Sequence, residues 1–244
     1  MYTELILRPS RLADQVIYPD QARKMVASAL DGQGIDPAVF GRDATGKTLQ
    51  GVIGHVKDGS GFGAAPRIAF NGGRGFMRLY GMGPAGSELL LSHAIRIYNG
   101  VAQAQGPTVQ KIAQGSCVME HTHFMVVHNI HILVTNKKPS HRAVPLHEAA
   151  ALAAIRRHIV GGLTSQAALL GLIASPPREE DIEVLEATPC SVPIQPGIYA
   201  SAYKNVAFAM PYRLKGPWFA GLLRSRGYGL MRENSLTNPS KEIQ

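Results

Sequence analysis

The stretch that most constrains this chain lies near its C-terminus and reads Gly221-Leu-Leu-Arg-Ser-Arg-Gly227-Tyr228-Gly229. A glycine is followed by five residues with two arginines, and then by a glycine-aromatic-glycine triplet. Glycine tolerates positive φ and has no Cβ, so the main chain of such a loop can come close to another backbone. We therefore expect the amides of Gly227 and Gly229 to face phosphate oxygens, with Arg224 and Arg226 supplying charge. The pattern predicts a clamp on a nucleic-acid backbone.

The distribution of charge indicates the same kind of partner. Lysine and arginine exceed aspartate and glutamate by 25 to 17, a formal net charge of +8. Residues 41–145 contain eleven basic residues and four acids, and residues 200–232 contain six basic residues and no acid. Two basic blocks suit a polyanion, because each neutralised phosphate releases condensed counterions. The alternative is a basic protein that uses its charge only to stay dispersed.

Length and cysteine content narrow the class of protein. With 244 residues and 45% hydrophobic content, the chain can bury one large core or two smaller ones. Cys117 and Cys190 are far apart and in no paired spacing, which argues against a disulfide framework and against a cysteine zinc site. The first residues alternate like a strand and do not form a signal peptide, so we expect a cytoplasmic protein.

The N-terminal part of the chain predicts a strand followed by a helix. Residues 3–8 alternate like a strand with one apolar face. A helix is expected to begin at Pro19 and to end at Gly32, because apolar residues recur between them at helical spacing. This spacing places Arg23 and Lys24 away from the buried face of that helix.

Farther along, the periodicity predicts more elements of both kinds. A helix is expected over 88–98, and residues 116–135 are expected to form two strands joined near Asn129. Two helices are then expected within 146–173, separated by Gly161-Gly162, and a strand over 206–210 leads into the glycine-rich loop.

This order of elements predicts an α+β fold with two ferredoxin-like (RRM-like) halves, a domain 1–140 and a domain 141–244. The helical segment 146–173 is expected to be an insert that projects from the second half, because Arg156 and Arg157 make it too polar for a core. These arginines at a helix end suit two interpretations. They compensate the helix dipole, or they present two guanidinium groups to an RNA groove.

Two stretches together resemble the repeat-associated RNA-binding superfamily of CRISPR systems. Residues 221–229 match the second half of its glycine-rich pattern, although Phe219 stands where the leading glycine would be. The stretch Gly75-Phe-Met-Arg-Leu-Tyr-Gly-Met-Gly83 and the apolar run after it resemble the strand, turn and helix of its CRISPR-RNA-processing endonucleases. The opening Tyr18-Pro-Asp-Gln-Ala-Arg23, the chain length and the lack of a histidine before His55 look most like the type IV branch.

The resemblance implies an endoribonuclease that needs no metal or other cofactor. It would cut precursor CRISPR RNA beside the repeat hairpin, leave a 2′,3′-cyclic phosphate and stay in a larger ribonucleoprotein complex. Related enzymes often use a histidine near the first helix, so its absence makes Arg23 the candidate for stabilising the phosphorane. Lys24 and Tyr18 are candidate helpers, and His55 is a candidate general acid or base. The alternative is a non-catalytic subunit that holds the guide's 5′ end with the same glycine-rich loop.

Contact with the RNA is expected at three places. The first is the glycine-rich loop, and the second is the helix end at Arg156 and Arg157, which would hold the duplex stem. The third is a set of arginines that would hold the single strand, namely Arg67, Arg74 and Arg78.

One further pattern suggests nucleotide hydrolysis. Gly41-Arg-Asp-Ala-Thr-Gly46-Lys47-Thr48 has the spacing of a phosphate-binding P-loop. A P-loop follows a buried strand and opens a helix, whereas here the preceding apolar stretch is short and the following one contains helix-breaking glycines. A surface turn is therefore the preferred interpretation, with a P-loop nucleotide hydrolase as an alternative.

Another pattern is a group of four histidines at His121, His123, His128 and His131. On a strand His121 and His123 share a face, while His128 and His131 face opposite ways. No cysteine lies nearby and Glu120 is the adjacent carboxylate, so structural or surface histidines are favoured over a metal site. A catalytic role for one of them stays open.

Overall fold

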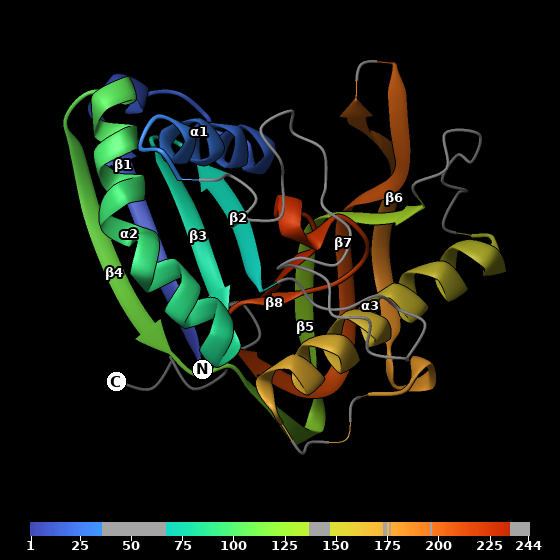
Figure 1. Cartoon of the computed structure of the whole chain (residues 1–244). Coiled ribbons are helices and arrows are strands. Elements are labelled where there is room, and N and C mark those ends of the chain that lie inside the picture. Colours follow the sequence, from blue (N-terminus) through green and yellow to red (C-terminus); the bar gives the residue numbers. More distant parts are fainter. Residues whose placement is uncertain (36–66, 137–146, 173–174, 176, 196, 235–244) are drawn as a thin grey trace, which may run out of the picture. The chain divides into compact units, whose positions relative to one another are not determined.

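The computed structural model describes the chain except for residues 36–66, 137–146, 173–174, 176, 196 and 235–244. Contacts divide the chain into two compact units (Figure 1). The first unit comprises residues 1–116, 169–171 and 224–227, and the second comprises the remainder. Among the helices of the described residues, none is long and apolar enough to cross a membrane.

The first unit has the element order of a ferredoxin-like domain. Its elements are β1 (Tyr2–Pro9), a 3-10 helix η1 (Ser10–Leu12), α1 (Pro19–Asp31), β2 (Ile68–Gly73), β3 (Phe76–Met82), α2 (Gly83–Gln105) and β4 (Thr108–Gly115). The strands pair antiparallel in the order β2-β3-β1-β4. A βαββαβ unit produces this order, with its first and third strands in the middle. The predicted α+β, ferredoxin-like fold is confirmed for this unit.

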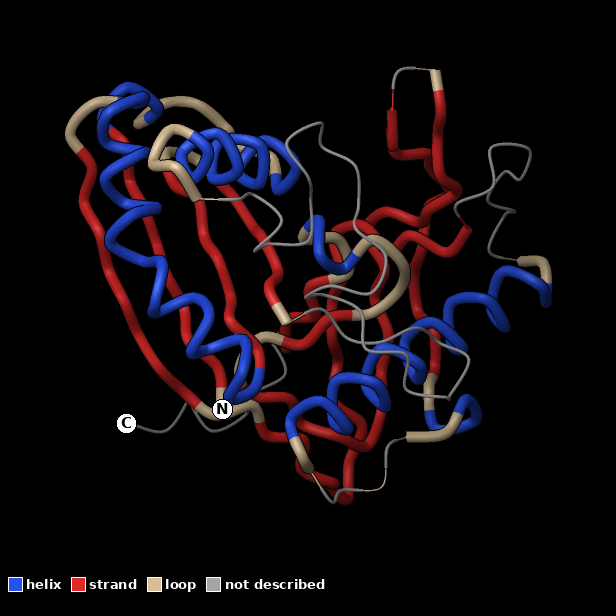
Figure 2. The backbone as a smooth tube through the Cα atoms, in the orientation of Figure 1, coloured by secondary structure: helices blue, strands red, loops and turns tan. Residues whose placement is uncertain are grey.

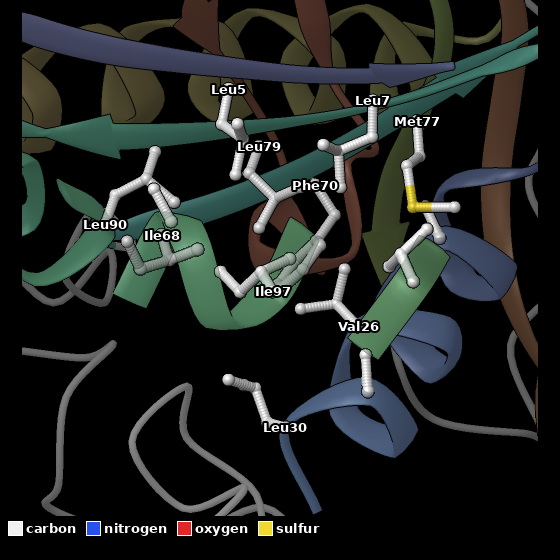
Figure 3. Close-up of a cluster of buried hydrophobic side chains, with 14 of the residues drawn as sticks. Leu5, Leu7, Val26, Leu30, Ile68, Phe70, Met77, Leu79, Leu90 and Ile97 are labelled. Carbon is white, nitrogen blue, oxygen red and sulfur yellow. The ribbon is translucent and has the colours of Figure 1, made fainter. Parts of the chain in front are cut away.

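The core of the first unit lies between this sheet and its two helices, which cover the same face of the sheet (Figure 1). Leu5 and Leu7 of β1 are fully buried there, as the alternation predicts. Figure 3 shows them together with side chains from β2, β3, α1 and α2, including Phe70, Leu79, Val26, Leu30, Leu90 and Ile97. The helices touch closely at Gly100, where a Cβ would lie 2.4 Å from the carbonyl oxygen of Ala29.

The second unit is built on a five-stranded antiparallel sheet in the order β6-β7-β5-β9-β8. Its strands are among those drawn in red in Figure 2. Along the chain follow β5 (Val118–Asn136), α3 (Ala149–Leu170), a 3-10 helix η3 (Glu179–Asp181), β6 (Glu183–Gln195), β7 (Ile198–Lys215), β8 (Trp218–Phe219), a 3-10 helix η4 (Arg224–Arg226) and β9 (Leu230–Glu233). The contacts of η4 assign it to the first unit.

The two halves of the chain share one plan with one substitution. The order β5-α3-β6-β7 repeats β1-α1-β2-β3, and β9 lies beside β5 as β4 lies beside β1. Where the first half has α2, the second half has β8 and the glycine-rich loop. The segment predicted as a helical insert therefore occupies, as α3, the place of the first helix of the repeat.

The division between the units falls at residues 116 and 117, whereas the expected domain boundary is at 140 and 141. The physical reason is β5, which pairs with β7 over most of its length and so belongs to the second sheet. β5 is one strand, so the expected turn near Asn129 is wrong: Asn129 pairs with Ala207 in mid-strand. An irregularity lies earlier, between His121 and Val126.

α3 is a single helix, which corrects the prediction of two helices separated by Gly161-Gly162. A Cβ on Gly162 would lie 2.5 Å from the carbonyl oxygen of Phe219, so this glycine allows the helix to approach β8 and does not end it. Five residues at four-residue spacing along α3 are at most 4% exposed: Ala151, Ile155, Ile159, Leu163 and Ala167. Because the helix is packed along its length, the expected projecting lobe is also wrong.

Candidate nucleic-acid interface

The N-terminus of α1 forms where the sequence predicts it. Pro19 occupies the first helical position, and its fixed φ suits a helix start. The amide of Tyr18, at the N-cap, donates to the Gln21 side chain at 2.9 Å. This capping leaves Asp20 in the first turn, where a carboxylate is stabilised by the helix dipole.

Arg23 lies one turn after Asp20, and its side chain is buried. The residue is 7% exposed, and its Nη2 donates to Asp20 Oδ1 at 2.6 Å. The expectation that Arg23 faces solvent is therefore wrong, whereas Lys24 is exposed as expected. The physical reason is the partner: a carboxylate three residues earlier on the same helix lets a guanidinium group be buried in a charge-assisted hydrogen bond.

A second arginine, from the C-terminal region, approaches the same carboxylate. Nε of Arg226 on η4 lies 3.8 Å from Asp20 Oδ1, and the residue is 9% exposed. Arg224, at the start of η4, is 7% exposed. Arg23 and Arg226, which are far apart in the sequence, thus share one acidic residue at the start of α1. A shared carboxylate restricts the positions of both guanidinium groups.

Gly227 brings η4 close to α1 and β2. Its φ is +82°, and a Cβ would lie 1.8 Å from the carbonyl oxygen of Phe70 and 2.6 Å from Cβ of Pro19. Only glycine has room there, and only glycine adopts this backbone conformation without strain. The loop pattern therefore does specify positive φ and close backbone approach, but the approach is to the protein's own backbone.

The amides of the loop glycines are used inside the chain. The amide of Gly227 donates to the carbonyl of Arg224 at 2.8 Å, and that of Gly229 donates to the carbonyl of Ile132 at 2.9 Å. Neither is available to a phosphate oxygen in this structure, which corrects the expectation that both amides face the RNA. The loop arginines are also more buried than expected, since each makes its contacts within the protein.

The three arginines expected to hold a single strand lie at or beside the strands β2 and β3. Arg74 is exposed in the turn between these strands, and Arg67 is partly exposed just before β2. Arg78 is more constrained: its Nε lies 3.1 Å from Glu4 Oε1, and its Nη1 donates to the Tyr80 hydroxyl at 3.0 Å. Burial acts to lower the pKa of Arg78, but the hydrogen bond to Tyr80 and the charges of Tyr80, Glu4 and Tyr2 outweigh it, so the pKa is raised.

Arg156 and Arg157 lie in the middle of α3. The helix continues to Leu170, so compensation of the dipole at a helix end does not apply to them. Arg157 is exposed and Arg156 is partly exposed. One turn of α3 here also holds the glycine-rich loop, because Gly221 donates its amide to the carbonyl of His158 at 3.2 Å.

The four histidines of β5 occupy different environments. His121, His123 and His131 are exposed, and His128 is fully buried, so His128 and His131 face opposite ways as predicted. Burial lowers the pKa of His128, whose Nε2 lies 2.8 Å from the carbonyl oxygen of Tyr212. Within the described residues, no group of three His, Cys, Asp or Glu side chains could hold a metal ion. His55 and the P-loop-like stretch 41–48 lie outside the described residues.

A family model described as "Type IV CRISPR-associated endonuclease Csf5" matches residues 5–235. The chain belongs to this Csf5 family. Among solved structures, it is similar to "Csf5, CRISPR-Cas type IV Cas6 crRNA endonuclease", with 20% identity, a TM-score of 0.69, and coverage of 96% of this chain and 99% of that one. It is also similar to a crystal structure of Cas6b, with 13% identity, a TM-score of 0.55, and coverage of 96% and 100%. No curated protein sequence matches the chain.

Membership of the Csf5 family confirms the predicted CRISPR-RNA-processing endonuclease of the type IV branch. The two solved structures show that the paired ferredoxin-like plan extends over almost the whole chain. Membership of an endonuclease family favours the interpretation as a nuclease over two alternatives, a non-catalytic guide-binding subunit and a P-loop nucleotide hydrolase.

Two residues were not predicted from the sequence. Asp20 shapes the site at the start of α1, and Gln166 binds the segment of the second unit that leads into the glycine-rich loop. Asp20 is not among the residues predicted for the site, although its spacing of three from Arg23 is a visible signal for a helical ion pair. Gln166 of α3 is 1% exposed and binds the segment before the loop, donating to the carbonyl of Pro217 at 2.6 Å and accepting from the amide of Phe219 at 3.1 Å. No local pattern identifies that contact, because its partners are some fifty residues away.

Proposed function

We propose that this protein cuts precursor CRISPR RNA beside the repeat hairpin without a metal ion. The ribose 2′-oxygen attacks the adjacent phosphorus while the bond from phosphorus to the 5′-oxygen breaks. The products are a 2′,3′-cyclic phosphate and a 5′-hydroxyl end. A base takes the proton of the 2′-hydroxyl, and an acid gives a proton to the leaving 5′-oxygen. The observation that carries the proposal is the meeting of Arg23 and Arg226 at Asp20 in a member of an endonuclease family.

Arg23 is the residue that we assign to stabilising the phosphorane. An arginine keeps its charge at every accessible pH, so it neutralises developing negative charge and does not act as the base. Its 2.6 Å bond to Asp20 holds the guanidinium group in place before RNA arrives. A preorganised cation in a partly dry site costs little reorganisation when charge develops, which is the condition for strong electrostatic catalysis.

The proton transfers need other groups. Tyr18, 63% exposed at the N-cap of α1, and the exposed Lys24 flank Arg23 in sequence and are our candidate helpers. His55 is proposed as general acid or base on its residue type. Tyr18, Arg23 and Lys24 all lie near the N-terminus of α1, and Arg23 alone is assigned to the phosphorus.

RNA binding is proposed to combine buried and exposed arginines. Arg224 and Arg226 contribute positive potential from within the loop whose shape Gly227 and Gly229 set. We assign direct phosphate contacts to Arg74 and Arg157, which are exposed, and further contacts to the partly exposed Arg67, Arg78 and Arg156. Because a cut hairpin keeps its phosphate contacts, we expect the product to stay bound and to enter a complex with other CRISPR subunits.

The test is single-turnover cleavage of precursor repeat RNA in EDTA by wild type, Arg23→Ala and Arg23→Lys. We expect Arg23→Ala to lower the rate about a hundredfold or more while affinity changes only a few fold, because the lost interaction belongs to the transition state. Lysine at this position should restore the rate only partly, since a point charge does not reproduce a planar fork. Arg96→Ala, which removes an exposed arginine from α2, is the matched control.

Two results would refute this proposal. Cleavage by Arg23→Ala at the wild-type rate would remove Arg23 from the chemistry and direct attention to His55 and to the histidines of β5. Loss of cleavage by the wild-type protein in EDTA, or products without a 2′,3′-cyclic phosphate, would refute the metal-independent mechanism.

A further inference from the structure

The face of the first unit's sheet opposite α1 and α2 carries a group of aromatic and cationic side chains. Side chains alternate along each strand, so the residues that do not join the core under the helices project from this other face. Near the end of the sheet where β1 stops and β3 starts, they include Arg8, Phe76, Arg78 and Lys111. Arg8 and Lys111 are exposed, and Phe76 is partly exposed.

Phe76 lies along the sheet because its cross-strand neighbour is a glycine. Gly73 pairs with Phe76, and a Cβ on Gly73 would lie 2.3 Å from Cε1 of the Phe76 ring. The ring therefore occupies the space where a side chain of β2 would stand. A ring that lies along a sheet, and does not stand away from it, can offer a π-face to a ligand.

Two guanidinium groups flank this ring. Cζ of Arg8 lies 5.4 Å from the ring centroid and Cζ of Arg78 lies 5.2 Å from it, both within cation–π range. Arg78 also forms an ion pair with Glu4 and donates a hydrogen bond to the Tyr80 hydroxyl, so its position is set before any ligand binds. Across the sheet, Lys111 is paired in register with Ile6, which in turn pairs with Arg78. The group thus combines one aromatic surface with three cations.

We infer that Phe76, Arg8, Arg78 and Lys111 form a binding site for an unpaired nucleotide, with the base on Phe76 and the backbone phosphates on the cations. Every base has a π-face, so stacking on an aromatic ring with nearby cations is the chemistry by which proteins hold single-stranded RNA without reading its sequence. A duplex offers no free base face at its sides, and this site would therefore take an unpaired segment and not the hairpin stem. The inference extends the RNA binding of the proposed function but depends on neither Arg23 nor cleavage.

The experiment measures affinity of the full chain for two probes at one fixed salt concentration. One probe is decauridylate with a central 2-aminopurine, and the other is a blunt RNA hairpin with no unpaired flank. Phe76→Leu, which keeps apolar volume but removes the ring, is expected to weaken decauridylate binding about fivefold to a hundredfold, the value of one stacked base. Its affinity for the hairpin should change less than twofold.

Phe124→Leu is the matched control, because Phe124 is an exposed phenylalanine with Arg213 at 5.9 Å in the second unit. It should change neither affinity. An unchanged affinity of Phe76→Leu for decauridylate, or an equal loss on both probes, would overturn the inference.

A second measurement does not depend on the stability of Phe76→Leu. Stacking quenches 2-aminopurine, so its emission in decauridylate should fall on binding to wild type. The fall should shrink with Gly73→Ala, which retains Phe76 and all the cations but forces the ring from its position. Emission that does not change on binding to wild type would refute stacking. Because neither measurement uses cleavage, failure here is distinct from failure of the nuclease mechanism.

Discussion

The close contact of Gly227 with β2 makes a strong prediction about stability. Replacing Gly227 with alanine puts a Cβ 1.8 Å from the carbonyl oxygen of Phe70. That is shorter by about 1.7 Å or more than an ordinary contact between heavy atoms, which is about 3.5–4.0 Å. The oxygen cannot move away easily, because the pairing of Phe70 with Leu79 on β3 holds this part of the edge strand β2 in place. The loop must move instead.

Two contributions add to the cost of Gly227→Ala. A residue other than glycine at positive φ is destabilised by about 1–2 kcal/mol. Displacement of the loop removes the packing around η4 and the contact of Arg226 with Asp20, which raises the expected loss to about 3 kcal/mol or more. For a chain of this size such a loss lowers the midpoint of thermal unfolding by roughly 6–12 °C.

Gly34→Ala separates the two contributions. Gly34 has φ of +68°, and no atom lies within 4 Å of the position of its Cβ, so this variant carries only the backbone strain. Thermal unfolding of both variants, followed by circular dichroism, gives the comparison. We also expect Gly227→Ala to cleave precursor RNA more slowly at a temperature where it is folded, because Arg226 no longer lies beside Asp20. If Gly227→Ala unfolds at the same temperature as Gly34→Ala, the argument from close contact fails.

Three further predictions concern single side chains. Asp20→Asn should slow cleavage about tenfold or more, because Asp20 acts by positioning Arg23. In an Arg23→Ala background it should have little further effect on the cleavage rate. Equal effects of Asp20→Asn in both backgrounds would contradict this role. Gln166→Leu should destabilise the protein by about 2–4 kcal/mol in chemical denaturation, because a buried carbonyl and a buried amide lose their partner; a loss below about 1 kcal/mol would contradict it. Burial lowers the pKa of His128 below its ordinary value of 6.5, so the unfolded chain binds a proton more readily and stability should fall as pH drops below about 6.5. His128→Gln should flatten the dependence of stability on pH between pH 7 and 5. The control His131→Gln, at an exposed position, should not. An equal change of stability with pH in wild type and His128→Gln would contradict the role of His128.

Much of the first unit was predictable because its signals are local. The strand with Leu5 and Leu7, the helix that begins at Pro19 and the stop at Gly32 depend on alternation, on a fixed φ and on apolar spacing. The glycine-rich loop was recognisable for the same reason, since its residues are consecutive. These local signals predict the ferredoxin-like fold, and the resemblance carried by consecutive residues implies the endonuclease family.

Tertiary structure decided what those same residues touch. Gly161-Gly162 has the composition of a helix end, but the backbone of β8 lies against Gly162, so the helix continues and approaches it closely. Arg23 appears solvent-facing by helical spacing, yet Asp20 makes its burial favourable. The sequence alone thus determined the first strand, the start of the first helix and which conformations the glycines allow. Only the fold decided which surface each glycine meets and which acid each arginine pairs with, because those partners come from distant parts of the chain.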